Sequence, residues 1–137
     1  MSVWPKALPE SPSLSTAEGT LVSVSIHVEP HYLESLLEAL AQVSFPINPQ
    51  IYHDAALVYR YPDGRHESQG ATLVEFPAYE GRLDEVRAAM QAYGFPPESL
   101  HAVGMLDEIQ AESHVEIAPP GAPYVSRYRM KRRAAAV

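Results

Sequence analysis

The chain has 137 residues, 46% of them hydrophobic, and a formal net charge of −7, which fits one domain with an ordinary core. The absence of cysteine excludes a disulfide framework and thiolate chemistry. No apolar run approaches the ~18 residues of a membrane helix, and no basic flank precedes an apolar N-terminal core, so we expect no membrane partner, no signal peptide and a cytoplasmic location.

The composition divides the chain into three parts. Residues 1–19 are rich in Pro, Ser and Glu and lack apolar periodicity, which predicts a flexible arm with Trp4 as its one large apolar anchor. Residues 20–118 carry the apolar periodicity and predict a single domain. Residues 119–137 begin with a Pro-rich linker and end in a basic tail.

The first predicted strand spans residues 20–29. Its apolar residues alternate with polar ones, which is typical of a half-buried strand. Glu29 and Pro30 then turn the chain, because proline suits the first position of a helix. A helical stripe follows from Leu33 to Val43, and it must end before Pro46.

The second half predicts a hairpin, a helix and a strand. Residues 50–61 and 66–76 read as strands joined by Pro62-Asp63-Gly64, a strong turn signal, and Gly70 predicts a bulge. The second helix starts near Arg82 and ends at Gly94, a residue suited to left-handed geometry. Residues 100–106 read as a strand, and residues 107–116 as a short helix or an edge strand.

The two halves resemble one another. A gapless self-alignment places Leu33 on Leu83, Leu40 on Met90, and Phe45-Pro46 on Phe95-Pro96. The order strand–helix–strand–strand–helix–strand predicts two split βαβ units. The expected fold is therefore an α+β ferredoxin-like βαββαβ plait, with a four-stranded antiparallel sheet and both helices on one face.

The helix-free face of that sheet is expected to be polar. The first and third predicted strands should be neighbours at the centre of the sheet, and the alternation directs three of their polar side chains to this face: Ser23, Ser25 and Glu75. His27 lies on the same face and, with Glu75, would make an acid–base pair if the protein were an enzyme. No nucleophile motif, phosphate loop or closely spaced metal-ligand pair is visible, so we expect no catalytic residue, cofactor or metal.

The basic tail holds five of the ten basic residues. Tyrosine interleaved with arginine would suit weak binding of nucleic acid or another anion. We favour the alternatives over such binding, namely a solubilising tail or a strand that packs on the acidic body, because five charges alone give weak, salt-sensitive binding. The body itself carries too much negative charge to favour nucleic acid.

The turn after the first strand resembles ACT domains, small ligand-sensing modules. The matching residues are Ile26-His27-Val28-Glu29-Pro30-His31-Tyr32-Leu33, then Leu36, Leu40 and Phe45-Pro46-Ile47. The same outline is similar to PII-like trimers and to small plait chaperones that bind signal peptides. ACT domains commonly have glycine after the proline, where this chain has His31. The resemblance implies a homo-oligomer, preferably a dimer, that binds a small anion such as an amino acid.

These observations favour a regulatory or ligand-binding module over an enzyme. The expected ligand site is the turn formed by His27, Glu29, His31 and Tyr32, where the backbone N–H groups at a helix start favour an anion. Two alternatives remain open. One is a protein- or peptide-interaction module that uses the sheet or the terminal arms, and the other is an enzyme with its site on the helix-free face.

Overall fold

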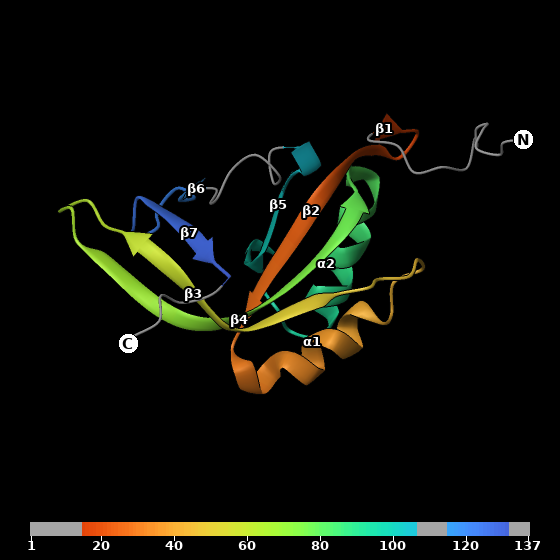
Figure 1. The fold of residues 1–137 in the computed structure, drawn as a ribbon, viewed down its shortest axis with the longest axis horizontal. Coiled ribbons are helices and arrows are strands. Elements are labelled where there is room, and N and C mark those ends of the chain that lie inside the picture. The colour runs from red at the N-terminus through yellow and green to blue at the C-terminus, as the bar shows by residue number, and fades with distance from the viewer. Residues whose placement is uncertain (1–14, 107–114, 132–137) are drawn as a thin grey trace, which may run out of the picture.

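The computed structural model describes residues 15–106 and 115–131. Within them, seven strands form one sheet in the order β1-β2-β4-β3-β7-β6, and β5 also pairs with β2 (Figure 1). All of these pairings are antiparallel. The strands are β1 (Ser15–Thr16), β2 (Gly19–Val28), β3 (Gln50–Arg60), β4 (His66–Tyr79), β5 (Leu100–Gly104), β6 (Val115–Ile117) and β7 (Ser126–Met130). The two α-helices are α1 (Leu33–Leu40) and α2 (Leu83–Ala92).

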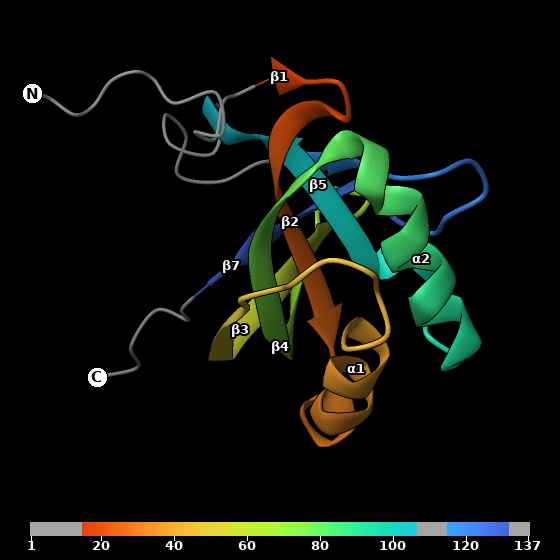
Figure 2. The ribbon, with the colours of Figure 1, turned by 90° about the vertical axis from the view of Figure 1, so that its right-hand side faces the viewer.

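The main core lies between one face of the sheet and the two helices (Figure 2). The alternating apolar residues of β2 point into it, with Val24 and Ile26 almost fully buried. Leu36 of α1 and Val86 and Met90 of α2 meet them at the helical spacing expected from the sequence. The apolar side chains that this packing removes from water stabilise the β2–α1–α2 arrangement.

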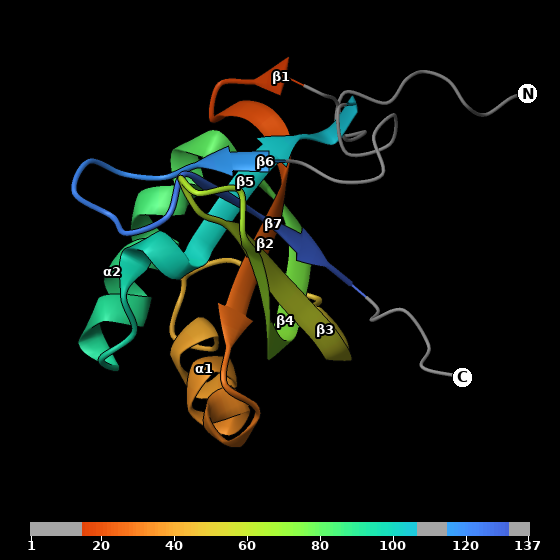
Figure 3. The same ribbon diagram turned by 90° about the vertical axis from the view of Figure 1, so that its left-hand side faces the viewer.

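The sheet curls on its helix-free side. The register between β3 and β4 shifts between Tyr52 and Ala55, and a β-bulge of this kind bends a strand and increases its twist. Beyond the shift, β3 pairs with β4 on one side and with β7 on the other. As a result β7 and β6 lie on the opposite side of the sheet from the helices (Figure 3).

The predicted four-stranded ferredoxin-like plait is therefore wrong, and the description of the fold as ACT-like is wrong for the same reason. The sheet has seven strands within the described residues, because β1 adds to β2 and the β6–β7 hairpin extends the edge of β3. A plait would have left the helix-free face flat and open. Here the curled sheet encloses much of that face.

Some sequence-based expectations fall outside the described residues. These are the arm before residue 15, including Trp4, and the segment 107–114, for which a short helix or an edge strand was expected. Within the residues that the structure describes, no helix has the length and apolar character needed to span a membrane.

Candidate ligand-binding site

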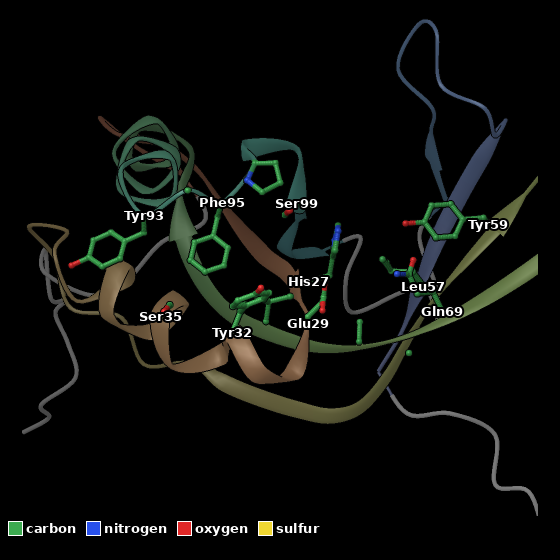
Figure 4. A pocket seen from close by; sticks show the side chains of 15 residues that line it. His27, Glu29, Tyr32, Ser35, Leu57, Tyr59, Gln69, Tyr93, Phe95 and Ser99 are labelled. Carbon is green, nitrogen blue, oxygen red and sulfur yellow. The ribbon is translucent and has the colours of Figure 1, made fainter.

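A hollow of about 590 Å³ lies around the C-terminal end of β2 (Figure 4). Its walls come from β2 and the following turn, from α1, from the β3–β4 pair, and from the segment after α2. The lining residues are His27, Val28, Glu29, Tyr32, Ser35, Leu57, Tyr59, Gln69, Gly70, Ala71, Tyr93, Gly94, Phe95, Pro96 and Ser99. His27 stands between an aromatic group (Tyr32, Tyr93, Phe95) and a group on the curled strands (Leu57, Tyr59, Gln69).

The turn after β2 brings Tyr32 to the hollow. Pro30 occupies the start of a 3₁₀ turn over Pro30–Tyr32, where its fixed φ is favourable and its missing N–H costs nothing. The Tyr32 N–H donates to the Glu29 carbonyl over 2.9 Å and closes this turn. The chain then continues directly into α1, so the turn is held by the same packing that buries Leu36.

The end of α2 brings Phe95 to the same aromatic side of the hollow. Gly94 has φ of 88°, the left-handed conformation expected from the sequence. The Phe95 N–H donates to the Met90 carbonyl over 2.9 Å, and the Gly94 N–H donates to the Gln91 carbonyl over 3.0 Å. This is the Schellman pattern, which reverses the chain and returns the next side chain to the helix. Phe95 accordingly packs on the main core while it lines the hollow.

A buried charge cluster lies next to the hollow on the helix-free side of β2. Its centre is Glu116 of β6, whose side chain is 13% exposed. Glu116 Oε1 lies 2.7 Å from Arg127 Nε and 2.6 Å from Arg129 Nη1, and its Oε2 lies 2.7 Å from His101 Nδ1. The Arg129 side chain is only 7% exposed. One carboxylate thus joins three side chains from β5 and β7.

Arg129 connects this cluster to the hollow. Its Nη2 donates to Nδ1 of His27 over 2.9 Å and to the Ser99 carbonyl over 2.9 Å. His27 and Ser99 both line the hollow. The guanidinium of Arg129 therefore links the charge cluster directly to two residues that line the hollow.

Both ends of this connection have shifted pKa values. Burial, reinforced by the positive charges of Arg129 and Arg127, lowers the pKa of His27 from 6.5 to about 3, against a smaller opposing effect of Glu116. Burial would raise the pKa of Glu116, but the hydrogen bond from His101, the charge of Arg129 and the hydrogen bond from Arg127 hold it at about 2. At neutral pH His27 is therefore neutral and Glu116 is ionised.

Three of the four residues predicted for the ligand site line the hollow: His27, Glu29 and Tyr32. His31, the fourth, is not part of the lining. Its exposed ring lies 3.6 Å from the Glu29 carboxylate through Nε2 and 4.2 Å, between ring centroids, from Tyr32. Whether these residues bind a ligand stays a prediction.

The polar residues predicted for the helix-free face are spread along it. Ser25 is paired in register with Glu75 on β4 and with His101 on β5, and it is only 8% exposed. Ser23 lies two residues earlier on the same strand. The structure does not bring His27 and Glu75 together as an acid–base pair, because His27 contacts Arg129 and Glu75 forms an ion pair with Lys131 at 3.1 Å.

Sequence reasoning missed that the residues after the second helix line the hollow. One alternative left open for the basic tail, a strand that packs on the acidic body, is what Ser126–Met130 form, as β7 between β3 and β6. The contacts of Arg127 and Arg129 with Glu116 were not predicted. The available signal was the alternation of these arginines with other residues at the period of a strand.

Searches of protein-family models and of curated protein sequences found no match to this chain. Within the described residues, no group of three or more His, Asp or Glu side chains is placed to hold a metal ion. The geometry of the hollow therefore carries the functional argument.

Proposed function

We propose that this protein binds a small organic molecule in the hollow around the end of β2. The observation that carries the proposal is the meeting of aromatic walls and one half-buried, oriented imidazole in the same concave space. Small-molecule sites are typically concave and mostly apolar, with a few convergent polar groups and titratable residues of shifted pKa. We further expect a regulatory or sensing role, a homo-oligomer and a cytoplasmic location, as the sequence suggests.

The proposal favours binding over catalysis. His27, the one titratable group with a strongly shifted pKa in the lining, is engaged by Arg129 at Nδ1. A histidine with a pKa of about 3 is a poor general base near neutral pH, because proton transfer is most efficient when the pKa lies near the working pH. A neutral, fixed imidazole instead suits recognition of a ligand.

A blocking substitution tests the proposal. Ser35 lies on α1 at the edge of the hollow, so Ser35→Trp would fill it, whereas Glu38→Trp places the same ring elsewhere on α1. We would screen a fragment library against the full chain by ligand-observed NMR and thermal shift. A ligand at 100 times its dissociation constant adds ~2.7 kcal/mol of stability. Hits that disappear in Ser35→Trp and persist in Glu38→Trp support the hollow. An absence of hits, or equal loss in both variants, contradicts it.

A further inference from the structure

The hydrogen bond from Arg129 decides which proton the His27 ring carries. A guanidinium has only donors, so Nδ1 of His27 must accept and cannot hold a proton in this arrangement. The proton of the neutral imidazole is then on Nε2. His27 lines the hollow, and Nε2–H is the one donor that its ring has left for a ligand, so the matching ligand group is an acceptor.

The charges around His27 favour an acceptor that is negative. Arg127 and Arg129, whose side chains are 10% and 7% exposed, share the single carboxylate of Glu116, which leaves this trio with a net positive charge. Within the part of the chain that the structure describes, Glu75 is a further carboxylate on this face, 13% exposed, and its Oε1 lies 3.1 Å from Lys131 Nζ. Charges that are shielded from water interact more strongly than exposed ones.

The lowered pKa of His27 follows from the same charges. After burial, the charges of Arg129 and Arg127 are the largest causes of its fall, and they outweigh Glu116. A positive potential that discourages a proton on the ring also favours an anion beside it.

The other end of the hollow is aromatic. Tyr32, Tyr93 and Phe95 stand together on one side of His27 in Figure 4. Tyr32 and Tyr93 are 48% and 42% exposed, unusually open for large apolar rings. Aromatic rings prefer offset or edge contacts with another ring, and such pairs add to the gain from burial alone.

A cationic ligand group would find only weak electrostatic attraction in the hollow. The one carboxylate in the lining is Glu29, whose side chain is 65% exposed and lies 3.6 Å from His31. Exposed ion pairs contribute little, because water screens both charges. The shielded positive charges of Arg127 and Arg129 therefore outweigh Glu29, and the hollow favours a negative ligand.

We propose that the ligand is an aromatic carboxylate, with its ring among Tyr32, Tyr93 and Phe95 and its carboxylate accepting the Nε2–H of His27. This inference rests on the proposed function of the hollow. Arg129 acts as a positioning residue, since it holds the His27 tautomer and supplies positive potential from behind the ring.

Three probes of nearly equal size test the charge preference: phenylacetate, phenylacetamide and 2-phenylethylamine. We expect the full chain, titrated by NMR at pH 7, to bind phenylacetate about tenfold more tightly than the amide, a ratio typical of a screened partly buried charge. The amine should bind weakest. Equal or tighter binding of the amide or the amine overturns this inference but leaves the hollow as a binding site. Fragment hits in the hollow with no binding of phenylacetate also overturn it, whereas no hits of any kind overturn the proposed function itself.

Arg129→Gln tests the positioning role. The ratio of phenylacetate to phenylacetamide affinity should fall from about ten to near one, because loss of the positive charge weakens binding of the carboxylate more than binding of the neutral amide. The ¹⁵N shifts of His27 should also lose the fixed Nε2–H pattern. Arg65→Gln makes the same charge change on an exposed side chain and should keep the ratio. If Arg129→Gln does not fold, His27→Phe removes the Nε2–H donor and should weaken the binding of phenylacetate, and an unchanged affinity would contradict the inference. An unchanged ratio in the folded variant contradicts the inference.

Discussion

Arg129 donates a hydrogen bond to Nδ1 of His27 over 2.9 Å, although 102 residues separate them in sequence. In the sheet order, β7 lies three steps from β2, through β3 and β4. Three strand spacings of about 4.8 Å would put the two backbones about 14 Å apart in a flat sheet. The contact therefore depends on the curl of the sheet, and it joins the C-terminal charges to the proposed site.

The depressed pKa of His27 predicts an acid-sensitive stability. The unfolded chain takes up a proton near pH 6.5, while the folded ring stays neutral until about pH 3. The contribution of neutral His27 to the free energy of unfolding is therefore complete above pH 6.5 and is lost as the pH falls toward 3. Between pH 7.5 and 5 we expect a loss of about 2 kcal/mol, measured by urea unfolding. His27→Gln should lack this share of the pH dependence, and His66→Gln, at an exposed position, controls for removal of an imidazole. Equal pH dependence in wild type and His27→Gln would contradict the assignment.

Glu116→Gln should destabilise the protein strongly. Removing the carboxylate leaves Arg129 buried without its charge partner, and breaking a buried ion pair from one side typically costs about 3–5 kcal/mol. Glu34→Gln removes an exposed carboxylate on α1 and should change the free energy of unfolding by less than about 0.5 kcal/mol. The contribution of Glu116 is present above pH 4.5 and declines as the pH falls toward 2, because its folded pKa is lowered. Similar midpoints for the two variants in urea would refute the role of the cluster.

Leu36→Ala should open a cavity under α1. Leu36 is fully buried against β2 and α2, and truncation of such a residue costs about 2–5 kcal/mol. Ile117→Ala removes apolar atoms from a side chain that is 79% exposed, so we expect less than about 0.5 kcal/mol. Both free energies can be measured by chemical unfolding. A small effect at Leu36 would mean that the core between the sheet and α1 is not packed as described.

Gly81→Ala should disturb the contact between the β1–β2 hairpin and the start of α2. A Cβ at Gly81 would lie 2.7 Å from the Glu18 carbonyl oxygen, and the Gly81 N–H donates to that same oxygen over 2.6 Å. The backbone must therefore shift, at a cost of about 1–3 kcal/mol. Gln91→Ala, on the exposed side of α2, is the matched control and should be nearly neutral. A Gly81→Ala protein as stable as wild type would show that the close approach is absent.

The local elements follow closely from the sequence. The apolar alternation from Val22 to Val28 forms β2, and the turn at Pro62-Asp63-Gly64 is closed by a Gly64 N–H to Tyr61 carbonyl bond of 2.9 Å. Gly94 terminates α2 in the left-handed conformation. Such features depend on φ restrictions and side-chain periodicity, which neighbouring residues set among themselves.

The pairing of strands across the whole sheet could not be predicted from the sequence. The residues of Gln50–Arg60 and Ser126–Met130 do not indicate that these two strands pair, because pairing depends on the path of the chain between them. Arg127 and Arg129 read as solvated charges until Glu116 is placed beside them. A buried charge can be recognised only with its partner, since an isolated one would be too costly.

The sequence alone determined the periodic strands, the two helices with their ends, and the turn that holds His27, Glu29 and Tyr32, since these depend on short-range sterics and apolar spacing. Only the tertiary structure decided that the sheet curls and that Phe95 and Tyr32 come together in the lining of one hollow. It also decided that Arg129 fixes which ring nitrogen of His27 carries the proton. These last relationships join segments far apart in the chain, so they arise from burial and charge pairing in the folded protein.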